Sequence, residues 1–443
     1  MTAVVWFRDD LRLSGHAALA AAGRAAPAFV LDAGFAGLGG AAKWWLHHGL
    51  AALAADIAAR GGRLVLARGE AGAALAEIAA AAGADAVHAH AARIPAERAA
   101  QEEARRVLAA HGVRLVLHAG ALLHDPASLR SGAGTPYAVF TPFWRAFAAR
   151  EEAWLSAPAA AEPRFAPGPQ GLALDDLGLL PDHPWGDKLA ARWKVGEAAA
   201  ERRLEDFVAE GLAAYARGRD RPDLSATSRL SPHLRWGHLS PHRVWRRVRA
   251  AMDADPAAQP GGWAFLRQLA WREFAHHVLA AHPQMACENI KPGFDAFPWV
   301  EDAAAFARWT RGETGYPLVD AAMRELWATG WMHNRGRMVA ASFLVKHLRC
   351  DWRAGLAWFD DALVDADPAL DPFGWQWVAG SGADAAPYFR IFNPVLQAQK
   401  FDPEGAYRAR WGAVAGPPPM VEHGAARAAA LDAWRGLAKN SHN

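Results

Sequence analysis

The 443-residue chain has little of several features that would point to particular classes of protein. Its two cysteines, Cys287 and Cys350, form no CxxC pair and leave no plausible zinc set, which indicates a reducing compartment. Its 48 basic and 46 acidic residues leave a formal charge of +2, so any nucleic-acid surface must be a local patch. No signal peptide and no apolar run of roughly 18 residues is present, so we expect a cytoplasmic protein without a membrane partner. We also expect it to be a monomer.

Apolar residues and tryptophan are what the chain has in quantity. Hydrophobic residues make up 52% of it, and a chain of this length should divide into two or three domains with room for a buried cofactor. Of its 21 tryptophans, 16 lie from position 185 onward. The stretch DADPALDPFGWQW at 365–377 sets acids beside two oxidisable indoles. A turn next to an aromatic core would also account for that stretch.

The first 120 residues predict a parallel sheet. Short apolar runs alternate with alanine-rich helical stretches such as AAKWWLHHGLAALAADIAARG, and the runs read AVVWF, PAFVLD, RLVLAR, AVHAHA and VRLVLH. This β-α-β pattern predicts a Rossmann-like α/β domain over 1–125. The dinucleotide-binding pattern GxGxxG is missing after the first run, where WFRDDLRLSGH stands, and GLGG at 37–40 is interpreted as a turn.

The rest of the chain predicts a long connection and then a larger all-helical domain. Residues 126–190 are rich in Pro, Gly and Ala, and we interpret them as an interdomain connection over the surface. From 191 to 443 the strand patterns vanish and helical periodicity takes over, as in EFAHHVLAAHP and MVAASFLVKHLRCDW. The predicted fold is therefore an α/β domain followed by an all-α domain.

Polar residues in the helical half suggest a binding site for an anion. The loop from Tyr215 to Ser231 sets hydroxyl groups ahead of helices, which suits a pyrophosphate, although helix N-caps use the same residues. Arg272 lies near the middle of an apolar helix and should need a buried anionic partner. The pairs His47/His48 and His276/His277 are adjacent, so on a helix they point apart and do not predict a metal site.

Seven motifs occur in an order and spacing that resemble the photolyase/cryptochrome family. They are WFRDDLRL, the loop from Tyr215 to Ser231, TGYPLVDAAMREL, WMHNRGRM, DWRAGLAWF, GWQW and DAAPYFRIFNP. The chain is most similar to bacterial cyclobutane pyrimidine dimer photolyases. The resemblance implies FAD in the helical domain, a cavity facing damaged DNA, and often a folate (methenyltetrahydrofolate) or deazaflavin antenna. Glu97 stands at a folate-site position, but Ala96 replaces the Asn that folate binders often have. The sequence therefore does not decide which antenna is bound.

The resemblance also implies roles for individual residues. Trp375, Trp352 and Trp299 match a chain that carries electrons to the flavin. The positions that match cofactor-binding residues are Tyr215, Thr227, Ser228, Arg229, Leu230, Ser231, Arg272, Arg337, Asp365, Asp367 and Asp371. The positions that match the DNA-facing cavity are Gln268, Trp271, Asn334, Arg335, Met338, Trp377 and Arg390, and we expect Gln268 and Asn334 to be catalytic together with Asp371.

Two positions depart from the pattern of dimer photolyases. Asp371 stands where these enzymes commonly place an Asn facing flavin N5, as it does in plant cryptochromes, and a carboxyl buried there should have a raised pKa and could protonate N5. Gln268 stands where they commonly have a Glu, although its amide can still donate to a thymine carbonyl. Asn334, by contrast, argues for a dimer photolyase, because a (6-4) photolyase would have His at this position.

Two functions follow from the resemblance. One is light-driven repair of cyclobutane pyrimidine dimers, by electron transfer from excited reduced FAD to a flipped-out dimer. The alternative is a blue-light photoreceptor of the cryptochrome type. Only 32 residues follow Trp411, with nothing like the long polar tail of many signalling cryptochromes, so we expect repair.

Overall fold

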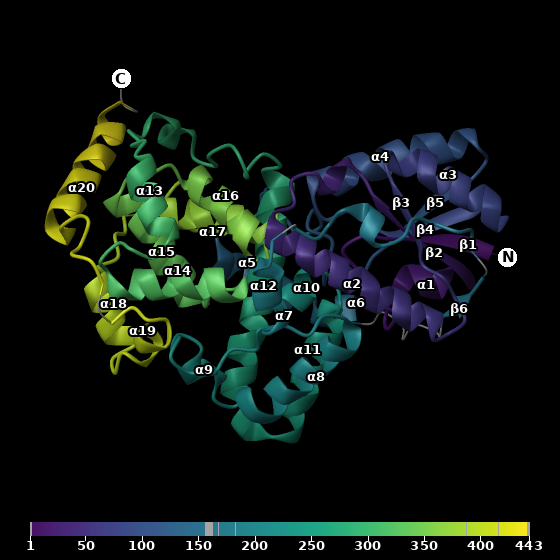
Figure 1. The fold of residues 1–443 in the computed structure, drawn as a ribbon, viewed down its shortest axis with the longest axis horizontal. Coiled ribbons are helices and arrows are strands. Elements are labelled where there is room, and N and C mark those ends of the chain that lie inside the picture. Colours follow the sequence, from purple (N-terminus) through teal and green to yellow (C-terminus); the bar gives the residue numbers. More distant parts are fainter. Residues whose placement is uncertain are drawn as a thin grey trace.

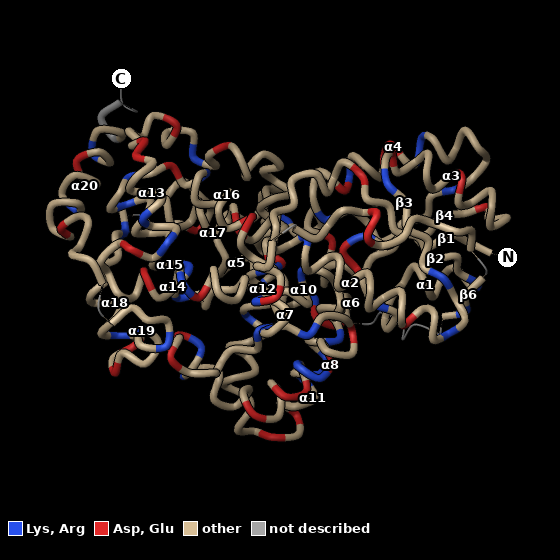
Figure 2. The backbone as a smooth tube through the Cα atoms, in the orientation of Figure 1, with Lys and Arg blue, Asp and Glu red and all other residues tan. Residues whose placement is uncertain are grey.

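The computed structural model describes residues 2–155, 163–166, 168–181, 183–386, 388–414 and 416–440. Figure 1 shows two lobes: the strands gather near the N-terminus at one end, and helices fill the other. The C-terminal helix α20 (His423–Asn440) lies at the edge farthest from the sheet. Basic and acidic residues are mixed along both lobes (Figure 2), as expected from the near-neutral total charge.

The sheet of the first lobe has the predicted parallel strands. Its strands are β1 (Thr2–Phe7), β2 (Arg24–Leu31), β3 (Val65–Arg68), β4 (Ala86–His90) and β5 (Arg114–His118). They are ordered β3-β2-β1-β4-β5, and every neighbouring pair is parallel. A two-residue strand, β6 (Arg164–Phe165), also pairs with β2. All five predicted strands are confirmed, whereas β6 is too short to produce a pattern that sequence could reveal.

Helices cover both faces of this sheet because side chains alternate along a strand. In β1, Val4 and Trp6 pack with α3 (Ala71–Ala82) and α4 (Pro95–Ala110). Val5 and Phe7 point to the other face and pack with α1 (Ala17–Ala21) and α2 (Gly40–Ala58). The chain reverses its winding direction between β1 and β4, so the carboxyl ends of these strands border the crevice where α/β proteins usually bind ligands.

Residues 126–190 do more than connect the lobes over the surface. Their elements are α5 (Phe140–Ala148), α6 (Glu151–Leu155), β6, η2 (Asp175–Leu177) and α7 (Trp185–Ala190). Phe143 and Phe147 of α5 are fully buried in the helical lobe, and Leu177 is fully buried against the α/β lobe. The prediction of a purely surface segment was wrong in this respect, because the overall Pro and Gly content hid the apolar side of FTPFWRAF.

All regular elements that the structure describes after position 190 are helical, as predicted. They are α8 (Glu197–Asp206), η3 (Phe207–Gly211), α9 (Tyr215–Gly218), α10 (Ser231–Arg235), α11 (Pro241–Ala254), η4 (Pro256–Ala258), α12 (Gln259–Ala281), η5 (Pro292–Ala296), α13 (Ala303–Thr310), α14 (Pro317–Thr329), α15 (Asn334–Ser342), η6 (Phe343–His347), α16 (Trp352–Ala362), α17 (Leu370–Ala379), α18 (Pro394–Phe401), α19 (Ala406–Arg410) and α20. Helix α12 is buried on most sides, and its buried residues include the polar side chains of Arg272, Glu273, His276 and His277 besides the apolar ones. Among the described residues, no helix combines the length and apolarity needed to cross a membrane.

Candidate functional site

A cavity of about 730 Å³ lies in the helical domain, between two apolar clusters of that domain. Helices α9, α10, α12, α15 and α17 contribute to its walls, together with the loops before α10 and α17. Its volume falls within the range of about 300–1,000 Å³ that is typical of ligand pockets. Its charged lining consists of seven arginines and four aspartates, which favours an anionic ligand.

The cavity brings together nearly all of the residues that the sequence singled out. Every predicted cofactor-binding residue lines it: Tyr215, Thr227, Ser228, Arg229, Leu230, Ser231, Arg272, Arg337, Asp365, Asp367 and Asp371. Every predicted DNA-facing residue lines it as well: Gln268, Trp271, Asn334, Arg335, Met338, Trp377 and Arg390. Trp375 is also part of the wall, whereas Trp352 and Trp299 lie behind it in the protein.

The aspartates of the segment 365–371 organise one wall of the cavity. Asp365 accepts two hydrogen bonds from Nη2 of Arg337, at 2.8 and 2.7 Å. Asp367 accepts the backbone N–H groups that begin α17, from Ala369 at 2.8 Å and from Leu370 at 3.1 Å. The carboxylate of Asp371 reaches back to accept the N–H of Asp367 at 2.8 Å. These local bonds explain why an acidic segment folds into a defined turn beside a buried cavity.

Two of these acids have opposite protonation tendencies. Burial raises the pKa of Asp371 well above its usual range, and the nearby acids Asp360 and Asp365 add to that shift. Burial also disfavours the charge of Asp367, but attraction to His276, Arg235 and Arg272 outweighs it and lowers the pKa of Asp367. The wall therefore holds two carboxyl groups four residues apart: Asp367 favours the ionised form, whereas Asp371 favours the protonated form more than a free aspartate does.

Arg272 has the buried anionic partner that its position required. Its Nη1 lies 3.1 Å from Oε1 of Glu273, and both side chains are buried. The other carboxylate oxygen of Glu273 accepts the N–H of Leu123 at 2.9 Å and contacts Nδ1 of His124 at 3.2 Å. The pair therefore ties the cavity wall to the chain that leaves the α/β domain.

The polar loop before α10 is held in an unusual conformation. Arg229 has φ of 50°, in the left-handed region that residues other than glycine adopt at a cost of about 1–3 kcal/mol. Its guanidinium lies over the ring of Trp331, 5.1 Å from the centroid. Nε1 of Trp331 in turn donates to Oγ of Ser231 at 3.1 Å. Strain of this kind is concentrated at ligand sites, which supports a binding role for the loop.

Tyr215 stands at the start of this polar region, on the short helix α9. Its side chain is buried, and burial raises the pKa of the phenol to about 12. The group is thus a neutral hydrogen-bonding hydroxyl at physiological pH.

Aromatic side chains form the outer part of the cavity. Trp271 stacks on Phe140 of α5, with ring centroids 3.7 Å apart and planes at 7°. Trp377 is fixed by a hydrogen bond from its Nε1 to the carbonyl of Asp384 at 3.0 Å. Both indoles are only partly buried, so their remaining faces are available to a planar ligand.

The arginines at the cavity differ in how far their charges are compensated. Arg335 is paired with Asp220 at 2.8 Å and lies over the ring of Phe401 at 3.9 Å. Arg390 instead contacts aromatic groups: its Nη2 donates to the hydroxyl of Tyr388 at 3.1 Å, and it lies 5.5 Å from the ring centroid of Trp377. Arg390 is therefore better placed than Arg335 to meet a phosphate.

The three tryptophans predicted to form a chain belong to one apolar cluster. Trp375 contacts the cavity and packs against Phe359, with ring centroids 4.9 Å apart. Trp352 is fully buried and donates from Nε1 to Asn289 at 3.0 Å, and Trp299 lies half-buried at the edge of the cluster. Nε1 of Trp375 is buried and has no hydrogen-bond partner in the protein, so this indole packs as an apolar ring.

Several residues of the cavity wall were not among the predicted site residues. Arg235 and Trp331 are the polar examples, and the apolar examples include Phe265, Phe359 and Phe373. Trp331 belongs to the WMHN motif, so its neighbours could have drawn attention to it. Arg235 occupies an ordinary position on a five-residue helix and could not have been recognised.

An α/β domain joined to a helical domain with a deep arginine-lined cavity defines a class of proteins that bind a nucleotide-type cofactor. The residues present fit FAD: arginines and loop N–H groups suit a pyrophosphate, carboxyl oxygens suit ribose hydroxyls, and the apolar and aromatic walls suit a flavin ring.

Comparison with known proteins gives the same picture. The family "DNA photolyase" matches residues 3–164, and "FAD binding domain of DNA photolyase" matches residues 265–415. A deoxyribodipyrimidine photo-lyase of Agrobacterium fabrum is 42% identical, over 99% of this chain and 98% of that protein. Cryptochrome-1 of Arabidopsis thaliana is 34% identical over 92% of this chain and 62% of its own length. The crystal structure of a bacterial class III photolyase from Agrobacterium tumefaciens superposes with a TM-score of 0.91 at 41% identity, covering 99% of this chain and 98% of that one.

The chain belongs to the photolyase/cryptochrome family. By this relationship it is a photo-lyase, an FAD-dependent DNA repair enzyme, and its similarity to cryptochromes is more distant.

Proposed function

We propose that the protein repairs cyclobutane pyrimidine dimers in DNA with light. The observation that carries this proposal is one cavity with two parts: an inner wall of carboxylates and arginines suited to FAD, and an outer part with two half-exposed indoles. When bound, reduced FAD supplies the light-driven electron that splits the cyclobutane ring. The remaining work belongs to the residues of this chain.

The inner residues hold and orient the cofactor. The Arg337–Asp365 pair is rigid because its hydrogen bonds are short and its carboxylate is buried, so it presents fixed charges to the ligand. Arg272 places a positive charge in the wall, and its partner Glu273 compensates that charge. Asp371 holds a proton on its carboxyl group near neutral pH, which makes it a donor toward the ring face of the cavity.

The outer residues receive the damaged bases. Base flipping brings a lesion out of the duplex, and a distorted pair costs less to extrude than an intact one. Trp271 and Trp377 would stack against the extruded bases, while the amide of Gln268 and that of Asn334 would donate to their carbonyl groups. Arg390 would neutralise a flanking phosphate.

The tryptophans supply electrons to the oxidised cofactor. Trp375 gives up an electron first because it alone of the three reaches the cavity. Trp352 and Trp299 then pass the electron deficiency outward through the apolar cluster they share, toward solvent. Indoles suit this role because they oxidise easily and still pack as apolar side chains.

The deciding experiment is illumination of the reduced protein with single-stranded DNA that contains thymine dimers, while the recovery of thymine absorbance is followed. The same mixture in the dark and undamaged DNA under light serve as controls. We expect recovery only with light and dimers together.

A blue-light receptor is the second candidate, and Asp371 is the observation that favours it, because the residue matches plant cryptochromes and has the raised pKa of a proton donor. Photoreduction of the bound flavin without any loss of dimers would support the receptor and contradict repair.

A further inference from the structure

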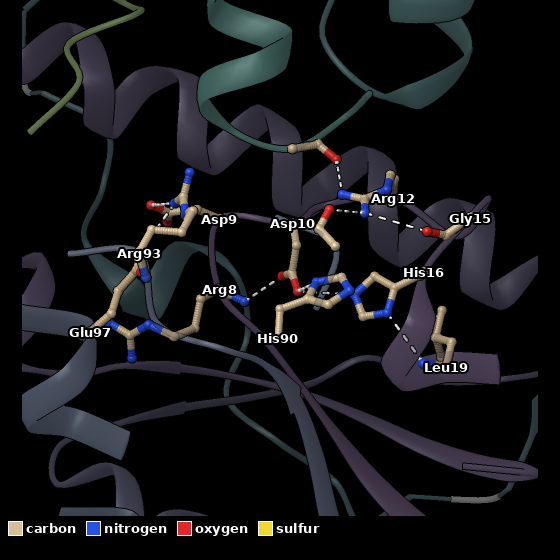
Figure 3. A network of polar contacts seen from close by, with 12 residues as sticks. Arg8, Asp9, Asp10, Arg12, Gly15, His16, Leu19, His90, Arg93 and Glu97 are labelled. Atoms are coloured by element: carbon tan, nitrogen blue, oxygen red, sulfur yellow. Dashed lines mark hydrogen bonds and ion pairs between the residues drawn. The ribbon is translucent and has the colours of Figure 1, made fainter. Parts of the chain in front are cut away.

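The loop that follows β1 fills the crevice where an α/β protein would usually bind a ligand. At the carboxyl ends of β1 and β4, buried charges pair with one another (Figure 3). Arg8 pairs with Asp32, and Nη2 of Arg93 lies 2.7 Å from Asp9 and 3.0 Å from Glu97. Glu97, the residue at the folate-site position, thus already forms an ion pair with Arg93 of the protein.

A cluster of Asp10, His16 and His90 holds the loop in shape. Among the described residues these three form the one group with spacing for a metal ion, but their hydrogen bonds argue against one. Nδ1 of His16 accepts the N–H of Leu19 at 3.2 Å, so Nε2 carries the proton and donates to Asp10 at 3.0 Å. His90 contacts the same carboxylate oxygen at 2.7 Å, and the N–H of Arg8 donates to the other oxygen at 2.7 Å. Both carboxylate oxygens of Asp10 are therefore already engaged by groups of the protein.

With Asp10 turned inward, the neighbouring Asp9 faces the helical domain. Its carboxylate pairs with Arg93 from its own domain and with Arg235 of α10 from the other. All three side chains are buried, so the charges are removed from water and depend on each other. The Asp9–Arg235 pair joins positions 226 residues apart in the sequence.

The backbones of the two domains also meet closely at this point. The N–H of Leu11 donates to the carbonyl of Trp236 at 3.0 Å, and Nη1 of Arg12 donates to the carbonyl of Gly237 at 3.0 Å. Gly237 has φ of +65°, and a Cβ atom there would lie 2.3 Å from the carbonyl oxygen of Asp9. The contact has no room for a side chain, so the loop and the end of α10 hold one relative position.

From α10 the contact continues to the acidic wall of the cavity. Nε of Arg235 donates to the carbonyl of Ala366 at 2.7 Å, and Nε1 of Trp236 donates to the carbonyl of Val364 at 3.0 Å. These two carbonyls flank Asp365, the acid that is paired with Arg337. Arg235 itself lines the cavity.

We propose that Asp9, in the α/β domain, is a positioning residue for the cofactor site in the helical domain. Asp9 holds Arg235, Arg235 holds the backbone of the segment 364–367, and that segment presents Asp365 and Asp367 to the ligand. This inference rests on the proposed function, because it takes FAD to be the ligand of the cavity. Without the charge of Asp9, Arg235 loses its ionised partner and would be drawn toward the carboxylates of the wall.

The test is the rate at which FAD leaves the purified holoprotein in the dark, followed by the rise of flavin fluorescence. We expect Asp9→Asn to release FAD about tenfold faster than the unaltered protein, the size of effect that networks of this kind carry. The matched control is Asp32→Asn, which also removes the acid of a buried Arg–Asp pair, but one confined to the α/β domain. We expect that control to release FAD within about twofold of the unaltered rate.

Equal release from Asp9→Asn and Asp32→Asn would overturn the proposal, because it would show a general loss of stability. A double-mutant cycle with Arg235→Gln tests whether Asp9 acts through Arg235: the effects of the two substitutions on FAD release should be strongly non-additive. If Asp9→Asn does not fold, Arg235→Lys provides the same test, since it keeps the charge opposite Asp9 but loses the Nε bond to Ala366. Unchanged FAD release from a folded Arg235→Lys protein would refute the proposal. An unaltered protein that takes up no FAD would contradict the proposed function instead.

Discussion

Replacing Asp371 with asparagine tests the protonation state of the acid at the cavity. Burial raises the pKa of Asp371 well above its usual range, although Nη1 of Arg337 lies 3.7 Å away and opposes the shift. In the unfolded chain the same group titrates near its ordinary value of about 3.9. Between these two pKa values the folded protein holds a proton that the unfolded chain has lost.

This difference in bound protons gives the sign and the size of the effect. Because the folded state binds one proton more, the free energy of unfolding falls as the pH rises, by up to about 1.4 kcal/mol per pH unit. The loss begins above the unfolded pKa and ends once the pH exceeds the folded pKa. Asparagine does not ionise, so Asp371→Asn should gain stability relative to the unaltered protein with that slope through the window.

The assay is urea denaturation of the FAD-loaded protein in the dark, from pH 5 to 8. The matched control is Asp367→Asn, four residues away on the same wall. Burial opposes the charge of Asp367, but His276, Arg235 and Arg272 lower its pKa, so it is ionised in both states at these pH values. The stabilising contribution of ionised Asp367 is lost only at lower pH. The difference in the free energy of unfolding between Asp367→Asn and the unaltered protein should therefore not change with pH. Asp360 titrates in all three proteins, and its pKa of about 7 is raised by burial and, to a smaller extent, by Asp367. The two variants are therefore compared at the acidic end of the range, from pH 5 to 6, below the titration of Asp360.

If the free energies of unfolding of Asp371→Asn and the unaltered protein differ by the same amount at every pH, the prediction is refuted. That result would mean that the folded and unfolded states bind the same number of protons at this site. Infrared spectra provide an independent check. The unaltered protein should show a stronger protonated carboxyl band at pH 7 than the variant, in which Asp360 still contributes to that band.

Three further predictions follow from the cavity and its surroundings. Purified protein should carry about one FAD per chain, and a stably folded protein that takes up none would contradict the assignment of the cavity. Trp375→Phe should nearly abolish photoreduction of oxidised FAD, yet dimer repair by protein already reduced with dithionite should persist; unaffected photoreduction would mean that electrons enter elsewhere. DNA affinity should fall steeply with salt, and Arg390→Ala should reduce the salt slope by about 1, which a salt titration measures. Arg335→Ala should change it less because Asp220 already compensates that charge, and equal slopes for the two variants would argue against this assignment.

The α/β domain was predictable because its information is local. A buried parallel strand is a short apolar run, and the five runs between residues 3 and 118 all became strands. The same reasoning failed for α5, because Phe143 and Phe147 lie in a stretch whose average composition is that of a loop. Composition reports on a whole segment, whereas burial depends on which side of one helix meets a partner.

The family and its FAD-binding domain were also recognisable in the sequence, because seven motifs kept their order. Motif positions indicated which residues belong to one site, and all but Trp352 and Trp299 line the cavity. Glu97, the residue at the folate-site position, forms an ion pair with Arg93 within the protein, a contact that the motif alone did not reveal.

The interdomain contact could not be read from residues near one another in the chain. Asp9 meets Arg235 across 226 positions, and the tight approach at Gly237 exists only when both domains are in place. The pKa shift of Asp371 has the same origin, because desolvation requires α12, α15 and α17 to close around it. Local patterns determine which segments become helices and strands, but ion pairing and burial are set by neighbours that folding brings from distant parts of the sequence.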